Sequence, residues 1–548
     1  MKRAIRIVSA VLSVILLLSL FTACGGNGGS GGTGENVNET GTLKLHWFQG
    51  IGINTVFEDP WIDQQSLYPY MVFDALVAYE PQNNRLVGRL ATEWTESEDG
   101  LTYTFTLRED VKWHDGQPFT AEDVLFTLNT QVANPRCNYR TNIQEISGYQ
   151  DVVDGKATEL AGVSAEGNVI TIKLDKKKAT FVHGLRTLLI LPKHLLQDVE
   201  ASKISAYEPY WSKPVGTGAY KMNTVNFPDN FTLIRNDDYW DAKAAIKNVQ
   251  FTNFAAGGND AIMNAMISGD LDYVFGNATN DMEVAQNVMN QNSDVKTLMI
   301  SGGGTIRFFG VNLNRKDGKQ NEDLKKVEVR RAFDMLIDKN GIADFYSGQG
   351  IAMSTFVNPN DDVYNDDVPA PVHDPQAAKA ALEAAGYDFS KTITIGYYYN
   401  DQTTKDVMAY ITQNFADVGI VAQTQFFADS NLIAEGKFDL MYYGANHWLP
   451  AGVYGQYGSN ANKELGVEER HEIFNDLAVN YFATSDAGER DRIAKELQAL
   501  DYQHRYLIPL YQLQTVQMYN SAHLQFPADI FEMSNCTNYR WSEWNLYG

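Results

Sequence analysis

Cysteine is scarce in this chain, with three residues among 548. So few thiols exclude a small fold that depends on a framework of disulfides. Cys137 and Cys536 could still form one bridge in an exported protein, and two unrelated buried thiols are the open alternative. The third cysteine, Cys24, follows an apolar N-terminal segment and has a different role, described below.

The common catalytic motifs are also missing. The chain has no G-x-S-x-G elbow, no H-E-x-x-H helix and no P-loop, and its nine histidines form no pair at metal-ligand spacing. With 68 acidic residues, carboxylate pairs arise by chance and do not indicate a glycosidase. One acidic cluster lacks EF-hand spacing and fits a solvated loop better than a calcium site: Asp361, Asp362, Asp366 and Asp367. We therefore predict a protein without catalytic residues, cofactor or metal, and keep an exported hydrolase as a distant alternative.

Positive charge is in the minority, because 44 Lys and Arg face 68 Asp and Glu, for a net charge of -24. Such acidity argues against a nucleic-acid partner and for a soluble surface. The length allows more than one compact lobe, and 44% hydrophobic residues suffice for real cores.

The chain starts with a segment typical of a secretory signal peptide. Lys2, Arg3 and Arg6 precede an apolar run from Ile7 to Phe21, which is shorter than the roughly 20 residues of a membrane-spanning helix. The residues that end this segment, FTAC, resemble the bacterial lipobox, in which the cysteine becomes the lipidated first residue. We expect residues 1–23 to be removed, Cys24 to carry lipid, and residues 24–39 to form a flexible Gly-rich linker.

The stretch from Leu440 to Asn462 contains no Asp, Glu, Lys or Arg, although 20% of the chain is charged. It mixes aromatic rings with glycines, as expected where a ligand stacks on side chains and approaches the backbone closely. Its aromatic residues are Tyr442, Tyr443, His447, Trp448, Tyr454 and Tyr457. The alternative is a strand, Phe438 to Tyr443, followed by a loop whose rings fill an ordinary core.

Strong local patterns predict several elements. Strands are expected at 42–47 and, from the alternation of Leu101, Tyr103, Phe105 and Leu107, at 101–107. Residues 68–78 read as a helix, and Thr120 with Asp123 forms a capping box for another. Asp374, Pro375 and Gly386 delimit a helix at both ends.

A β-α-β unit is expected further along the chain. Strands at 393–399 and 420–427 flank a helical run at 406–417, and such a unit requires a sheet. The apolar spacing from Val329 to Ile337 predicts an amphipathic helix.

The segment from Arg89 to Thr130, which contains VKWHDGQPFTAEDVLFTL, resembles the signature of the family 5 solute-binding proteins of bacterial ABC importers. This family includes oligopeptide, dipeptide and nickel binders. Further segments that resemble the family follow in order: PVGTGAYKM (214–222), NDDYWDAKAAIKNVQF (236–251), SGDLDYVFG (268–276), FFGVNLNR (308–315), VRRAFDMLIDKNGI (329–342) and DPQAAKAALEAAGY (374–387). We interpret these segments as scaffold.

The resemblance implies an α/β fold of the two-lobed, periplasmic-binding-protein type (type II), with an extra subdomain in lobe one and a two-strand hinge. Lobe one would contain 40–270 and 506–548, with the inserted subdomain at about 60–195, and lobe two would contain 271–505. The hinge strands are expected near 255–270 and 501–510. Such lobes close on a ligand, and a transporter recognises the closed form.

The resemblance also places a ligand site. In peptide-binding relatives a strand reading approximately G-W-x-x-D pairs with the peptide, and its aspartate holds the terminal ammonium. Here Gly444 takes the place of the glycine, Ala445 that of the tryptophan and Trp448 that of the aspartate. The predicted ligand-binding residues are Trp47, Phe48, Tyr398, Tyr399, Asn400, Tyr442, Tyr443, Gly444, Asn446, His447, Trp448 and Trp541.

The absent acid leaves the ligand open. A buried ammonium without a carboxylate partner is costly, and aromatic rings with a few amide and hydroxyl groups also suit stacked sugars. We expect a monomeric lipoprotein outside the cytoplasm, anchored on the outer face of the cytoplasmic membrane, that delivers a peptide to an ABC permease and its ATPase. An oligosaccharide is the close alternative, and a sensing role in place of transport is also open.

Overall fold

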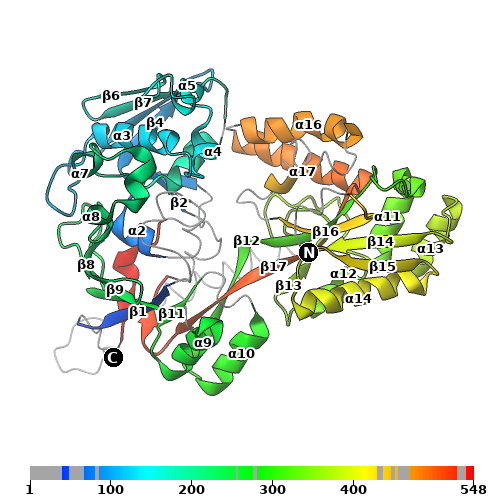
Figure 1. Cartoon of the computed structure of the whole chain (residues 1–548). Coiled ribbons are helices and arrows are strands. Elements are labelled where there is room, and N and C mark those ends of the chain that lie inside the picture. Colours follow the sequence, from blue (N-terminus) through cyan, green and yellow to red (C-terminus); the bar gives the residue numbers. More distant parts are fainter. Residues whose placement is uncertain are drawn as a thin grey trace, which may run out of the picture. The chain divides into compact units, whose positions relative to one another are not determined.

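The computed structural model describes residues 40–47, 67–80, 85–178, 180–254, 257–275, 281–428, 436–445, 451–454, 468–484, 486–527 and 538–547. All of them belong to one compact unit, residues 38–548. Within these ranges the chain alternates helices and strands around one large sheet and several smaller ones (Figure 1).

The largest sheet has eleven strands. In spatial order they are β15 (Val421–Phe426), β14 (Thr392–Tyr397), β16 (Leu440–Ala445), β12 (Val295–Val311), β17 (Leu507–Asn520), β11 (Tyr273–Val274), β1 (Thr42–Trp47), β10 (Asn248–Asn253), β9 (Asn230–Arg235) and β8 (Tyr220–Asn226), with β13 (Gly350–Ala352) paired to β17.

Two long strands, β12 and β17, join the halves of this sheet (Figure 1). They pair antiparallel, and β12 also pairs with β16 while β17 also pairs with β11. Their ladder is interrupted after Ile300, where residues 301–304 of β12 lie opposite Gln514 alone. A Cβ on Gly304 would lie 2.1 Å from the Leu513 carbonyl oxygen, so this bulge requires glycine.

A four-stranded antiparallel sheet is inserted between β1 and β8. Its order is β4 (Ala91–Glu96), β5 (Thr102–Leu107), β7 (Val169–Lys173) and β6 (Val163–Glu166). In β5 the buried residues alternate with half-buried threonines, which confirms the predicted strand. Helix α3 (Ala121–Ala133) starts with the predicted Thr120–Asp123 capping box and packs its apolar face into the core of this sheet.

His114 joins the inserted part to the main sheet. Its Nδ1 accepts a hydrogen bond from the Gly216 N–H at 3.1 Å, and its Nε2–H donates to the Gly218 carbonyl at 3.0 Å. Both glycines are required, because a Cβ would lie 1.8 Å from Val72 O at position 216 and 2.4 Å from Met71 O at position 218. Two scaffold segments that are far apart in the sequence, WHDG (113–116) and PVGTG (214–218), therefore contact each other in the folded protein.

The C-terminal half builds its cores on both faces of β12, β14 and β16. One core contains α11 (Val327–Leu336), α12 (Lys339–Asp344), α13 (Pro375–Ala384) and α14 (Gln402–Asp417), and another contains α16 (Glu468–Ala483) and α17 (Ala487–His504). Helix α13 has its predicted ends, since the Asp374 side chain accepts from the Ala377 N–H and Gly386 has φ +65°. The predicted β-α-β unit is also confirmed, because β14 and β15 are parallel and α14 connects them.

The predicted hinge crossing at 255–270 is wrong. Residues Gly258–Ser268 form helix α9, which packs on α10 (Met282–Gln291) and on β17 in one hydrophobic cluster. The connecting strands are β12 and β17 instead, so the second expected crossing lies in the right part of the chain but begins a little later, at Leu507. The predicted lobe boundary at residue 270 falls inside this cluster, and the lobe limits stay a prediction.

The predicted helix at 68–78 is shorter than expected. Helix α2 (Tyr68–Val72) ends because Phe73 is extended and the Gly218 N–H takes the Val72 carbonyl. The chain then forms β2 (Val77–Glu80), paired with β3 (Arg85–Gly88). The remaining short elements are α4 (Arg140–Ile143), α5 (Tyr149–Val153), α6 (Phe181–Gly184), α7 (Lys193–Leu196), α8 (Glu208–Trp211), β18 (Leu524–Gln525) and β19 (Asn545–Leu546).

Cys137 is buried in the core of the inserted part, where its thiol contacts Gln131 Oε1. Cys536, the expected alternative partner, lies outside the described residues.

His114 should make stability depend on pH. Burial lowers the pKa of His114 from its ordinary 6.5 to about 4, so the folded protein keeps the ring neutral while the unfolded chain protonates it. This stabilisation is complete above pH 6.5 and is lost as the pH falls toward 4, by about 3 kcal/mol. We expect His114→Asn to be less stable than the wild type in urea at pH 7.5, and the gap to close by pH 4.5. A gap of equal size at both pH values would contradict this role.

Candidate ligand-binding site

The candidate site lies where three parallel strands end. β14 runs parallel to β15 and β16, so the carboxyl ends of the three strands meet at one edge, the usual place for a ligand in an open α/β sheet. After β14 come Tyr398 and Tyr399, both half-buried, and Asn400, which is exposed. Asp401 then caps α14 by accepting from the Thr404 N–H at 2.7 Å.

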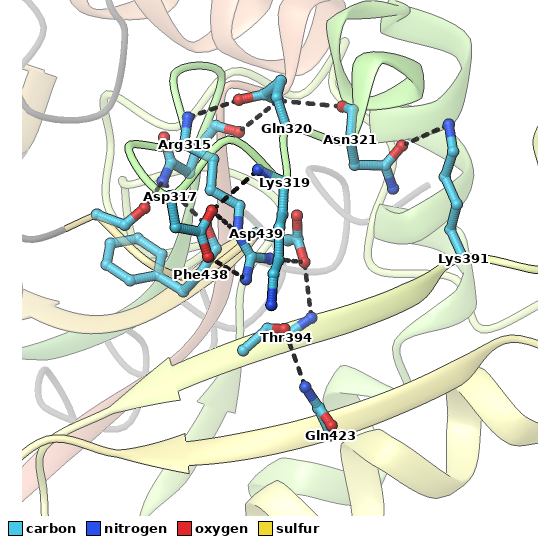
Figure 2. A network of polar contacts seen from close by, with 12 residues as sticks. Arg315, Asp317, Lys319, Gln320, Asn321, Lys391, Thr394, Gln423, Phe438 and Asp439 are labelled. Atoms are coloured by element: carbon cyan, nitrogen blue, oxygen red, sulfur yellow. Dashed lines mark hydrogen bonds and ion pairs between the residues drawn. The ribbon is translucent and has the colours of Figure 1, made fainter.

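A buried polar network fixes β16 at its other end (Figure 2). The Asp439 carboxylate, 2% exposed, accepts from the Thr394 N–H at 2.8 Å and from Arg315 Nη1 at 2.7 Å. Asn312 donates its N–H to the Asp439 carbonyl and its side-chain amide to the Phe438 carbonyl, both at 2.9 Å. Burial raises the pKa of Asp439, against the opposing pull of the Thr394 N–H and Arg315. These bonds hold β16 in register with both β12 and β14.

This register places Arg307 of β12 between Gly444 of β16 and Tyr511 of β17. The absence of a side chain at Gly444 gives the guanidinium its space, because a Cβ there would lie 2.1 Å from Arg307 Nη1 and 2.6 Å from the Tyr399 hydroxyl. The glycine is thus needed for side-chain packing across the strands.

Tyrosines surround this guanidinium. The Arg307 Cζ lies 3.7 Å from the ring centroid of Tyr399 and 6.0 Å from that of Tyr442, both within cation–π range. Tyr398 and Tyr399 share a hydroxyl–hydroxyl bond at 2.7 Å. Tyr511 links Tyr346, at 2.6 Å, to Tyr442 in a second chain of hydroxyls. Burial raises the pKa of Tyr398, so its hydroxyl keeps its proton and can donate to a ligand.

Of the predicted ligand-binding residues, five lie together at this edge with some exposure or at its rim: Tyr398, Tyr399, Asn400, Tyr443 and Gly444. Tyr442 is adjacent to them in β16 but fully buried, so it supports these residues from the core side. Phe48, Asn446, His447 and Trp448 lie outside the described residues.

The two remaining residues, Trp47 and Trp541, are core residues. Trp47 is 2% exposed and packs edge-on against Tyr68, Phe231 and Phe251. Trp541 is 6% exposed and donates its Nε1–H to the Tyr70 carbonyl. The expectation that both rings face a ligand is corrected by this packing, since aromatic residues at strand ends serve a core as well as a site.

A separate cavity of about 210 Å³ lies beside Trp541, lined by Asp74, Arg89 and Tyr239 among others. Several of its polar groups bond one another: Asp74 accepts from Tyr239 and Trp240 at 3.1 Å, and Arg89 donates to Asp241 at 2.7 Å. These bonds tie the NDDYW motif to the segment after α2 and indicate scaffold.

Sequence reasoning missed Arg307 and Asp439. The only local signal for Arg307 is a single charge inside the apolar run TIRFFGV, and its neighbours become known only with the strand register.

Metal and membrane signals are absent from the described part of the chain. Within it, no three His, Cys, Asp or Glu side chains gather in a way that could hold a metal ion. No helix there has both the length and the apolar character needed to span a bilayer.

Comparison with known proteins identifies the family. The model of the bacterial extracellular solute-binding proteins, family 5 (middle) matches residues 85–464. A Brucella ovis protein, named as a candidate ABC transporter peptide-binding protein, is 28% identical over 354 residues, 64% of this chain and 62% of that protein. The chain thus matches less than two thirds of that relative's length. The dipeptide-binding protein of Escherichia coli is 24% identical over 455 residues, covering 78% of this chain and 81% of that protein.

A solved structure supports the fold. The ABC transporter substrate-binding protein CtaP of Listeria monocytogenes superposes with a TM-score of 0.72 at 19% identity, covering 93% of this chain and all of that one. The predicted fold class, α/β and two-lobed with the periplasmic-binding-protein architecture, is confirmed by this likeness. From the family match, which spans more than half of its residues, this chain belongs to the bacterial extracellular solute-binding proteins of family 5.

Proposed function

We propose that this protein captures a peptide-like solute outside the cytoplasm and delivers it to the permease and ATPase of an ABC importer. The observation that supports this most is the group of half-buried tyrosines, Tyr398, Tyr399 and Tyr443, beside Gly444 at the carboxyl ends of β14 and β16. In a family named for binding solutes, an edge with accessible rings and hydroxyls is the best place for a ligand to stack and bond.

The proposed mechanism uses the two strands that join the halves of the sheet. Bending at the bulge of residues 301–304 would let the two lobes close over the ligand. Binding energy then selects the closed form, which the permease recognises. We place the lobes on either side of these strands, with the inserted subdomain in lobe one.

An oligosaccharide is the second candidate ligand. In the resembled peptide binders an aspartate holds the ammonium, and this chain has Trp448 at that position within an uncharged stretch from 440 to 462. Tyrosine rings with neutral donors also suit stacked sugar rings. Phe48, Asn446, His447 and Trp448 remain proposed ligand contacts on sequence grounds.

A thermal-shift panel separates the candidates. Di- to pentapeptides are compared with short glucans and mannans, and mass spectrometry identifies any solute that co-purifies. We expect peptides to raise the melting temperature in a concentration-dependent way, because ligand that binds only the folded state stabilises it. Shifts with glucans or mannans alone would favour the sugar reading, and saturable turnover of any peptide or glycoside would contradict a binding protein.

Two tryptophan variants test the site against the core. Trp448→Ala should weaken binding at least tenfold and leave the melting temperature of the empty protein nearly unchanged. Trp47→Ala should cost about 3–5 kcal/mol of unfolding free energy because it empties a packed core. A large loss of stability in Trp448→Ala with ligand affinity intact would show that Trp448 is a core residue.

Attachment to the membrane by lipid at Cys24 is also part of the proposal. The FTAC sequence and the Gly-rich residues after it suit a lipid anchor with a flexible tether on the outer face of the cytoplasmic membrane. In a bacterial host, Cys24→Ala should move the protein from the detergent phase to the aqueous phase in Triton X-114 partition. Cys137→Ala is the matched thiol control and should stay in the detergent phase. Equal partition of wild type and Cys24→Ala would contradict lipidation.

A further inference from the structure

Arg307 of β12 has no polar side-chain partner among the described residues, although it lies next to the candidate site. Its guanidinium is half-buried, and within the described ranges it takes part in no hydrogen bond or ion pair, only in ring contacts with Tyr399 and Tyr442. By contrast, Arg315 bonds Asp317 and Asp439, and Arg505 bonds Asp334 at 3.0 Å.

Such a cation is unfavourable without an anion. Removal from water costs a guanidinium its hydration, and cation–π contacts return only part of it. Burial works to lower the pKa of Arg307, but the neighbouring tyrosines Tyr442, Tyr399, Tyr511 and Tyr346 together raise the pKa, so the group stays charged. The site therefore holds a positive charge at its edge that the described residues compensate only in part.

Among the described residues, no carboxylate forms an ion pair with this guanidinium. The sequence after β16, from 446 to 462, contains no Asp or Glu. The first acid after β14 in the sequence is Asp401, and its carboxylate accepts hydrogen bonds from the Thr404 N–H and hydroxyl, both at 2.7 Å. The charge is thus available to a ligand at the same edge where Tyr398 and Tyr399 are accessible.

The surroundings restrict the guanidinium. Its Nη1 lies where a side chain at position 444 would be, and its Cζ lies 3.7 Å from the centroid of the Tyr399 ring. A planar guanidinium held in this way presents its N–H groups in a fork that matches a carboxylate in bidentate fashion.

We propose that Arg307 binds a carboxylate of the ligand, so that this site selects solutes that carry one. The inference rests on the proposed function, because it assigns a chemical class to the solute bound there. The carboxylate could belong to the C-terminus of a peptide, to an acidic side chain or to a sugar acid. At this edge a cation of the protein then binds an anion of the ligand, whereas in the resembled peptide binders an aspartate binds the ammonium of the ligand.

The test uses three pairs of probes, each made of a solute with a carboxylate and a counterpart without one, measured by isothermal titration calorimetry. They are tetra-alanine and its C-terminal amide, N-acetyl-Ala-Ala-Asp-Ala-amide and its Asn counterpart, and trigalacturonic acid and maltotriose. Wild-type protein should bind the carboxylate member of at least one pair at least tenfold more tightly. Arg307→Met should abolish this preference, and Arg307→Lys should retain part of it as a point charge.

Two further variants keep the result interpretable. Lys405→Met removes an exposed charge from the first turn of α14 and should leave the preference unchanged. Gly444→Ala keeps Arg307 in the sequence but displaces its guanidinium, so it should reduce the preference as Arg307→Met does. Arg307→Met should melt no lower than the wild type, because it removes a charge without an ionic partner.

The outcomes separate the two levels of the proposal. Binding of peptides or sugars with no carboxylate preference in any pair would overturn the role of Arg307 and leave the proposed function standing. A preference that persists in Arg307→Met, or a loss of stability without a change in selectivity, would also overturn it. Failure of wild-type protein to bind any of the six probes or any solute of the thermal-shift panel would overturn both.

Discussion

The antiparallel pairing of β12 with β17 is the constraint on which the rest of the structure depends. These strands carry the sheet from the β15–β14–β16 side to the β11–β1–β10 side, and the hydrophobic clusters on both sides include residues of one or both. Their ladder also sets the level at which Arg307, Gly444 and Tyr511 meet. The bulge at 301–304 breaks the ladder just before this level, and a second register shift follows between Arg307 and Phe308, so Arg307 lies in a short paired segment between two irregularities.

Two buried or half-buried charges of the C-terminal half, Asp439 and Arg307, differ in whether an opposite charge compensates them. At the start of β16, Asp439 is deeply buried and tolerated because Arg315 and the Thr394 N–H bond its carboxylate. Near the end of β16, Arg307 of the neighbouring strand β12 contacts tyrosine rings and, among the described residues, no carboxylate. The short strand β16 thus connects the paired charges around Asp439, which hold the strand in register, to the Arg307 guanidinium, which is available to a ligand. The fixed register at one end of β16 sets the geometry at the other end.

Local patterns predicted what is encoded locally. The alternation at 101–107, the capping box at Thr120 and the ends of the helix after Asp374 each depend on residues within a few positions, and all three were confirmed. The helix at 68–78 was too long because its end is set by Gly218, far along the chain. Trp47 and Trp541 were misplaced because a ring at a strand end looks the same in sequence whether it packs inward or meets a ligand.

The candidate site also combines features that the sequence predicts with features that depend on distant residues. The position of the tyrosines after β14 and of Gly444 in β16 could be predicted from resemblance and composition. Arg307 could not, because its neighbours Gly444 and Tyr511 are more than a hundred residues away and are brought to it only by the strand register. The family resemblance predicted which edge of the sheet would bind a ligand. The charge at that edge comes from Arg307, which the resemblance did not predict.

The deep burial of most tryptophans has an optical consequence. Trp47, Trp113, Trp211, Trp541 and Trp544 are each at most 6% exposed, so their fluorescence should respond little to a solute at the end of β16. Trp448 is the only tryptophan between Trp240 and Trp541 in the sequence. The chain therefore carries one indole in the uncharged stretch proposed to bind the ligand and five shielded indoles elsewhere, so a change in its intrinsic emission would report occupancy without a label.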